Sequence, residues 1–217
     1  MLTELNTVEL ERLKAILLTA DELKLAASLL FQSYHDDPLF MEIFRAEKPD
    51  YEQRLRAAIR EELNAFWQAK QPIIGLFQGE QLYGVACVIT PDSGIGSNRL
   101  WHWRLNMLLT AGYVSTKQLL EKEQKIHAAI PAERYHMLAF IAVAPKQQQL
   151  GLGHYLVHAV DSIVDKDETS EGIGVFVTLE KYKAFFADDK YQTVTDLAFN
   201  TVSGTLMFRQ RQPLLAR

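Results

Sequence analysis

The sequence predicts a mixed α/β domain in which helices flank one central sheet. Segments with apolar residues at helical spacing alternate along the chain with short apolar runs typical of strands. The 217 residues are 48% hydrophobic and 23% charged, which is enough apolar material for a substantial core. Because no repeat, low-complexity linker or long charge block divides the chain, we expect a single domain over residues 1–217.

The first 70 residues predict a strand and two helices. Residues 13–19, LKAILLT, form a short apolar run, and residues 20–37 then carry apolar side chains at helical spacing. We expect this helix to stop at Pro38. A second helix, with one apolar stripe, is expected between Asp50 and Lys70.

The rest of the chain predicts strands around one helical insertion. PIIGLFQ and LYGVACVITP, separated by GEQ, predict a tight hairpin within residues 71–100, and residues 101–130 predict helix. YHMLAFIAVAP is apolar enough for a strand buried on both faces, GIGVFVTLE predicts a further strand, and KYKAFFADD predicts a short helix. A terminal hairpin is expected to turn near Ser203-Gly204.

Composition narrows the classes of function. The net charge of −4 provides no basic field, so we expect no nucleic-acid partner. The single cysteine, Cys87, forms no internal disulfide and leaves no thiolate cluster for zinc. No run of about 18 apolar residues occurs, and acidic residues begin at the fourth position. We expect a cytoplasmic protein that does not bind membranes.

One turn carries the strongest chemical signal. The apolar run IAV ends at Val143, Pro145 prevents further pairing, and Gly151 and Gly153 open an amphipathic stretch. Free N–H groups and the positive end of a helix favour a phosphate there, and glycines let it approach closely. The turn is therefore predicted to bind a diphosphate.

Two common phosphate-binding motifs do not fit this turn. A P-loop needs Lys and Ser or Thr after its last glycine, but His154 and Tyr155 follow Gly153. A dinucleotide fingerprint needs a third glycine where the chain has Leu156, and too little chain follows for a doubly wound sheet. Hydrolysis of nucleoside triphosphates and dinucleotide binding are both disfavoured.

Residues 143–153, VAPKQQQLGLG, resemble the motif V-x-P-x-x-(R/Q)-x-x-G-x-(G/A) of the GNAT N-acetyltransferase superfamily, with Gln148 in the Arg/Gln position. FQSYHDDPLF and FFADDKY are similar to the branch that includes puromycin acetyltransferase-like proteins. The resemblance implies a mixed, mostly antiparallel sheet of about six or seven strands flanked by helices. It also implies acceptor-side helices within residues 1–70, an acetyl-CoA-binding strand, turn and helix within 131–165, and C-terminal strands within 171–217.

The same resemblance implies a co-substrate, acetyl-CoA, and no metal. The main chain of Ile141 to Val143 would pair with the pantetheine arm, and an N–H near Phe140 or Ile141 would polarise the thioester carbonyl. The pyrophosphate would lie on the amides that follow. The implied cofactor-binding residues are Phe140, Ile141, Ala142, Val143, Gln148, Gln149, Leu150, Gly151, Leu152, Gly153 and His154.

The catalytic residues depart from the family pattern. The position of the tyrosine that protonates the leaving thiolate is Phe186, which has no proton to give. Tyr182 is a substitute one turn earlier, the thiolate could leave unaided, or the protein binds acyl-CoA without transfer. His136 or Glu180 is the candidate base; Tyr135 points to the face opposite His136.

The acceptor is expected to be a primary amine of a small molecule. Tyr34, Asp36 and Asp37 cluster before Pro38, where carboxylates could attract a cation or could simply form a solvated helix cap. His154 and His158 lie one turn apart, but the sequence supplies no carboxylate or third ligand beside them. The resemblance also implies a possible homodimer through the terminal hairpin.

Overall fold

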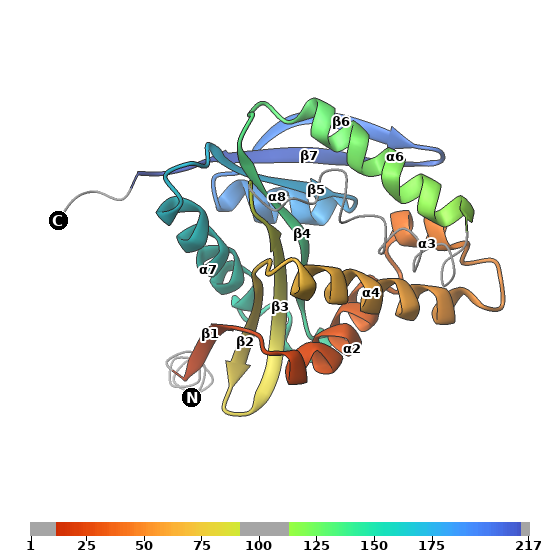
Figure 1. Ribbon diagram of the computed structural model, residues 1–217, viewed down its shortest axis with the longest axis horizontal. Coiled ribbons are helices and arrows are strands. Elements are labelled where there is room, and N and C mark those ends of the chain that lie inside the picture. Colours follow the sequence, from red (N-terminus) through yellow and green to blue (C-terminus); the bar gives the residue numbers. More distant parts are fainter. Residues whose placement is uncertain (1–11, 92–112, 214–217) are drawn as a thin grey trace.

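The computed structural model describes residues 12–91 and 113–213, and this part of the chain forms one seven-stranded sheet. The strand order is β1-β2-β3-β4-β5-β7-β6 (Figure 1). Within this described sheet, β4 and β5 are parallel and every other neighbouring pair is antiparallel. The predicted fold class is confirmed. The strands are β1 (Leu13–Leu17), β2 (Ile73–Gln78), β3 (Gln81–Ile89), β4 (Tyr135–Val143), β5 (Gly172–Val177), β6 (Gln192–Phe199) and β7 (Val202–Gln210).

Helices cover both faces of the sheet and bury two apolar clusters. On one face lie η1 (Ala20–Glu22), α2 (Leu23–Tyr34), α3 (Pro38–Phe44), α4 (Tyr51–Gln68) and α6 (Tyr113–Ala129) (Figure 1). On the other lie α7 (Leu152–Lys166) and α8 (Glu180–Asp188), with η2 (Pro145–Gln147) leading into α7. β4 is therefore enclosed between two helical layers.

β4 and β5 separate part-way along their length. Their parallel pairing ends at Leu138 and Val175. Beyond this point β4 continues beside β3 as far as Val143, while β5 continues beside β7 as far as Val177. We call the space between these two diverging ends the β4–β5 gap.

The first helix does not end where the sequence suggested. Pro38 begins α3, whereas α2 already stops at Tyr34. The Asp37 carboxylate accepts hydrogen bonds from the backbone N–H groups of Leu39 and Phe40 at 3.0 and 3.2 Å. Proline suits the first position of a helix because its missing N–H has no intrahelical partner there. The expected stop is thus the start of a new helix.

The turn of the terminal hairpin also lies at a different position from the one predicted near Ser203-Gly204. The chain reverses at Asn200-Thr201, where Asn200 has a φ of 52°. Gly204 lies inside β7, and a Cβ there would be only 2.3 Å from the Phe176 ring. This glycine therefore makes room for a ring, and asparagine, which tolerates left-handed backbone, supplies the turn.

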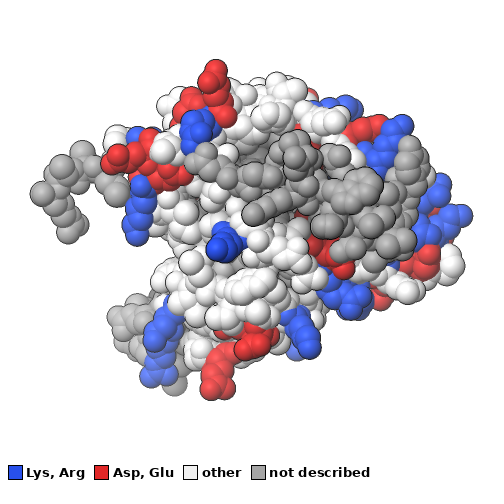
Figure 2. Space-filling model, viewed as in Figure 1, with Lys and Arg blue, Asp and Glu red and all other residues white. Residues whose placement is uncertain are grey.

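The charged surface and the helices carry two further observations. Among the described residues on the face in Figure 2, charged side chains of both signs are scattered, and they form no extended basic patch. Across residues 12–91 and 113–213, none of the helices combines the length and apolar character needed to cross a membrane. The predicted helix over residues 101–112 lies outside the described residues, and so does the end of the predicted hairpin segment from residue 92.

Candidate functional site

The predicted phosphate turn lies between β4 and α7. After η2 the backbone turns through two left-handed residues, Gln149 with φ 64° and Gly151 with φ 79°. Gly151 is the N-cap of α7, and a Cβ built on it would meet nothing within 4 Å. The turn is therefore open above Gly151, and its backbone conformation favours glycine.

The first turn of α7 presents unpaired donors. Among the described residues, none accepts a hydrogen bond from the N–H groups of Gly151, Leu152, Gly153 or His154, and the first bond is Tyr155 N–H to Gly151 O at 3.2 Å. Four donors at the positive end of a 15-residue helix favour an anion. Gly153 is needed for packing as well, because a Cβ there would be 3.0 Å from Phe185.

Gln148 folds back on the strand that precedes it. Its Nε2 donates to the carbonyl of Val143 at 3.1 Å. The side chain therefore caps the last carbonyl of β4, and its donor faces the strand instead of the open turn. Leu150, by contrast, is 45% exposed at the surface of the turn.

The gap side of β4 is occupied by a tyrosine. The Tyr34 hydroxyl donates to the carbonyl of Ile141 and accepts from the N–H of the same residue, both at 3.1 Å. In an antiparallel ladder the N–H and C=O of one residue point to the same side and alternate along the strand. Phe140 and Ala142 therefore direct these groups toward β3, and Ile141 directs them into the gap. Of the two N–H groups that the sequence singled out, at Phe140 and Ile141, the one that points into the gap is that of Ile141.

His136 lies far from the expected cleft. Its side chain is 1% exposed, its Nδ1 lies 2.8 Å from Ser170 Oγ, and its Nε2 lies 3.6 Å from Asp167. It sits in the half of β4 that pairs with β5, before the gap begins. Burial lowers the pKa of the imidazole, and Asp167 offsets part of that effect. This placement corrects the expectation that His136 could face the reacting groups as a base.

The other two candidate catalytic residues are on α8. Glu180 begins the helix, is largely exposed, and pairs with Lys183 at 2.9 Å. Tyr182 is 39% exposed and lies near enough to Tyr34 to affect the pKa of its hydroxyl. Phe186 is 3% exposed and packs against Tyr191 with ring centroids 5.3 Å apart. Tyr182 and Phe186 thus do not share one environment, although they lie one helical turn apart.

The two aspartates before Pro38 have different partners. Asp36 is almost fully exposed, and its Oδ1 lies 2.6 Å from His35 Nδ1. Asp37 caps α3 and also accepts a short hydrogen bond from the hydroxyl of Thr178, just after β5. Asp37 therefore ties the α2–α3 junction to the far side of the β4–β5 gap. Its carboxylate serves as a helix cap and a bridge, which weakens its case as an acceptor-binding group.

His154 and His158 share a carboxylate that the sequence did not reveal. Asp189 Oδ2 lies 2.8 Å from His154 Nδ1, and its Oδ1 lies 3.8 Å from His158 Nε2. The expectation that no carboxylate accompanies this pair is therefore wrong. In the two described ranges, however, no group of three or more His, Cys, Asp or Glu side chains is arranged to hold a metal ion.

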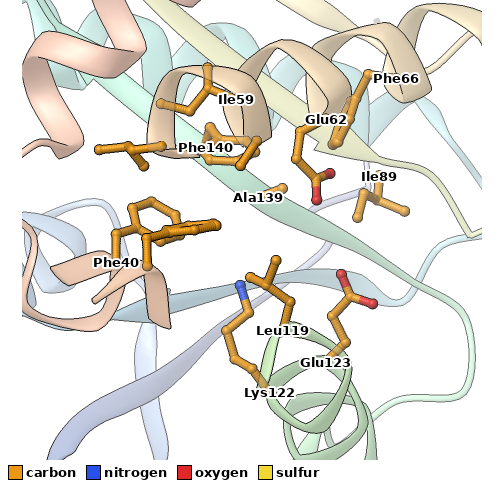
Figure 3. Close-up of a pocket in the computed structure, with 13 residues that line it drawn as sticks. Phe40, Ile59, Glu62, Phe66, Ile89, Leu119, Lys122, Glu123, Ala139 and Phe140 are labelled. Carbon is orange, nitrogen blue, oxygen red and sulfur yellow. The ribbon is translucent and has the colours of Figure 1, made fainter. Parts of the chain in front are cut away.

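A pocket lies between α3, α4 and α6, above β3 and β4 (Figure 3). Its walls are mainly apolar, with charged side chains from α4 and α6, and the cavity volume is about 50 Å³. The lining residues are Phe40, Phe44, Leu55, Ala58, Ile59, Glu62, Phe66, Ile89, Leu119, Lys122, Glu123, Ala139 and Phe140. Apart from Phe140, which was expected to bind the cofactor, sequence reasoning assigned none of these residues to a site, because each looks like an ordinary core or surface position of its own helix or strand.

Comparison with known proteins places the fold. No protein-family model matches the chain, and no curated protein matches its sequence. A structure from Corynebacterium glutamicum, described as histone acetyltransferase HPA2 and related acetyltransferase, is similar with a TM-score of 0.71 and 15% identity, covering 94% of this chain and 99% of that one. A putative acetyltransferase of the GNAT family from Desulfovibrio desulfuricans gives a TM-score of 0.52 at 16% identity, covering 91% and 97%.

The chain has the GNAT acetyltransferase fold. A further structure with this fold, a mosquito arylalkylamine N-acetyltransferase-like 5b, gives a TM-score of 0.59 at 14% identity, covering 91% of this chain and 99% of that one. At these identities the similarity describes the GNAT fold and no finer relationship. The puromycin acetyltransferase-like branch stays a prediction.

Proposed function

We propose that the protein is an N-acetyltransferase that moves the acetyl group of acetyl-CoA to the primary amine of a small molecule, by direct attack while both are bound. The observation that carries the proposal is the row of unpaired N–H groups at Gly151 to His154, next to a strand whose gap side is not paired with β5. Diverging strands beside an anion-binding turn suit a long ligand with a diphosphate.

The residues present fit coenzyme A. Four backbone donors and the α7 dipole complement a pyrophosphate, and Gly151 leaves space above them. Ile141 and Val143 carry the main-chain groups on the gap side of β4, and the pantetheine arm would take the place of the Tyr34 hydroxyl and the Gln148 amide that now bond them. When bound, acetyl-CoA would supply an acetyl group activated as a thioester. The chain would bind it, orient it and exclude water.

We propose the pocket of Figure 3 as the site of the acceptor. Phe40 and Phe140 give it aromatic walls, and the carboxylates of Glu62 and Glu123 come from helices on opposite sides. The Lys122 ammonium lies in the same lining, so the charge of the pocket is mixed, and its aromatic rings can hold an apolar body. An amine with an aromatic or alkyl body fits this lining, and one protein with the same fold is described as arylalkylamine N-acetyltransferase-like.

Gly151→Glu tests the phosphate seat. A carboxylate at the open side of the turn should repel the pyrophosphate, so we expect affinity for CoA in calorimetry to fall by more than about tenfold. Gly79→Glu is the matched control, because Gly79 also has positive φ (60°) and open space for a Cβ, but lies in the β2–β3 turn. Equal CoA affinity in the two variants would contradict this placement of the ligand.

A second function is favoured by one residue. Phe186 is buried and supplies no hydroxyl, which suits a protein that binds or senses acyl-CoA without transferring its acyl group. Release of CoA in the presence of a panel of aromatic and alkyl amines distinguishes the two functions. Tight CoA binding with no release on any amine would favour the sensing function.

A further inference from the structure

The Tyr34 hydroxyl bonds to a single residue of β4 that is 107 positions away in the sequence. It pairs with both the N–H and the C=O of Ile141 at 3.1 Å. These are the backbone groups that β4 directs into the β4–β5 gap, three residues after its pairing with β5 ends. A tyrosine hydroxyl thus lies at the one backbone position in the gap that the proposed function uses to polarise a thioester.

The ring of Tyr34 is held between the gap and the pocket. Its centroid lies 5.2 Å from that of Phe40 and 5.6 Å from that of Phe140, both in edge-on contact. Phe40 and Phe140 also line the pocket that we propose for the acceptor. The hydroxyl therefore lies where an amine from the pocket and a thioester in the gap would meet.

The hydroxyl of Tyr34 is protonated, as a hydrogen-bond donor must be. Although part of the side chain remains exposed, burial raises the pKa of the hydroxyl well above its usual value, and the bond to Ile141 offsets only part of this rise. Asp37 raises the pKa further. The group thus stays neutral and keeps its proton at any physiological pH, so it can donate a hydrogen bond but is a poor source of a transferable proton.

We propose that Tyr34 is a catalytic residue: when the acyl-CoA thioester enters the gap, its carbonyl oxygen replaces the present partners of these two groups and accepts hydrogen bonds from the Tyr34 hydroxyl and the N–H of Ile141. This inference rests on the proposed function. The amine nitrogen forms a bond to the carbonyl carbon, the C–S bond breaks, and sulfur leaves as thiolate. The amine loses one proton to solvent, and Tyr34 keeps its own. The hydroxyl stabilises the charge that develops on oxygen, and the thiolate leaves without a proton from position 186, because a thiol with a pKa of about 8.5 is a fair leaving group.

Tyr34→Phe removes this donor and keeps the ring. We expect kcat for CoA release to fall by about 10²-fold or more, as for other lost oxyanion donors. Affinity for acetyl-CoA should fall while affinity for CoA, which has no carbonyl, stays within about threefold. Infrared spectra of bound acetyl-CoA labelled with ¹³C at the carbonyl should show a higher stretching frequency in the variant, because a hydrogen bond to the oxygen is lost.

Tyr51→Phe is the matched control. Tyr51 donates its hydroxyl to the carbonyl of His35, at the same end of α2, but not in the gap. We expect this variant to keep the wild-type carbonyl frequency and to lose far less activity than Tyr34→Phe. Should Tyr34→Phe fail to fold, 3-fluorotyrosine at position 34 keeps ring and hydroxyl, and its stronger donor should lower the carbonyl frequency below that of the wild type.

Two results separate this inference from the proposed function. Equal carbonyl frequencies in wild type and Tyr34→Phe, or equal kcat values in Tyr34→Phe and Tyr51→Phe, overturn the role of Tyr34 and leave acetyl transfer intact. Binding of acetyl-CoA without transfer to any amine counts against the proposed function, and the infrared comparison then still decides whether Tyr34 touches the thioester.

Discussion

His136 shows how completely a fold can remove a titratable side chain from solvent. It is 1% exposed, and its polar partners are Ser170 and Asp167. A neutral imidazole is favoured in such surroundings, because burial penalises the charged form. The side chain thus joins β4 to the segment before β5, at the end of the sheet opposite the gap.

Because His136 is buried away from the gap, we expect it to affect how the stability of the protein depends on pH and not to affect the rate of the reaction. Since the folded pKa of His136 lies below that of the unfolded chain, its contribution to stability is present above about pH 6.5 and is lost as the pH falls through the lowered pKa. His136→Gln should remove this part of the pH dependence and reduce the free energy of unfolding by about 1–3 kcal/mol. Urea denaturation between pH 5 and pH 8, with exposed His127→Gln as control, measures both effects.

The pH profile of kcat would reveal a catalytic role of His136, which is the alternative to the structural role predicted above. If the residue acts as the general base, His136→Gln should abolish the rise of kcat with pH on the acidic side of that profile. A variant that changes stability but keeps the shape of the profile is the result expected from the buried location.

At the scale of elements, the α2–α3 junction closes the open end of the sheet. Tyr34 bonds to β4, and Asp37 accepts a hydrogen bond from Thr178 just after β5. The last residue of α2 and the N-cap of α3 therefore hold opposite sides of the β4–β5 gap. A short break between two helices, enforced by Pro38, makes both contacts compatible with one backbone path.

Asp37→Ala should weaken this closure. The substitution removes the cap of α3 and the bond to Thr178, so we expect the free energy of unfolding to fall by about 1–2 kcal/mol. Asp36→Ala removes a neighbouring but exposed carboxylate and should change it by less than about 0.5 kcal/mol. Chemical denaturation of the two variants at pH 7 checks the prediction. Equal losses would mean that the cap contributes little.

Sequence reasoning succeeded where structure is local. The 11 residues from Val143 to Gly153 contain the strand end, the left-handed Gly151 and the helix start, so their order alone predicted an open turn. The contact of Tyr34 with Ile141 was out of reach, since apolar spacing assigns a residue to a helix face but not to a partner 107 positions away. The pocket was hidden for the same reason, because it exists only where α3, α4 and α6 meet.

At the scale of the whole molecule, one charged cluster joins α7 to the C-terminal strand β7. Arg209 is 4% exposed, and its guanidinium lies 2.9 Å from Asp161 and 3.0 Å from Asp165. Its Nε–H is not aligned with Asp161, so that contact is an ion pair instead of a hydrogen bond. The Tyr191 hydroxyl also donates to Asp161, at 3.1 Å. One helical layer is thereby fixed to the sheet by polar groups beneath the surface.

Asp161 is expected to affect stability in the direction opposite to His136. Burial raises the pKa of its carboxyl to about 6, and Arg209 offsets this only in part. The folded state therefore binds the proton more tightly, and a contribution on the order of 3 kcal/mol, present below about pH 3.8, is lost as the pH rises through about 6. Asp161→Asn should flatten this change.

The measurement is the free energy of unfolding at several pH values between 4 and 7, in wild type, Asp161→Asn and Asp165→Asn. The flattening should appear in the first variant and be absent in the second. If neither substitution changes the slope, the carboxyl of Asp161 titrates near its ordinary value in the folded protein.

The pocket and the turn lie against different helical layers. This separation affects how the specificity of such a protein can change by substitution. The turn is encoded by one continuous segment, residues 143–154, whereas α3, α4 and α6 shape the pocket from a separate part of the chain. Substitutions at Glu62, Lys122 or Glu123 would alter which molecule enters without disturbing the backbone at Gly151. Under the proposed function, one donor-binding turn would thus be retained while successive variants are selected for new acceptors, and Tyr34 would lie where the two parts meet.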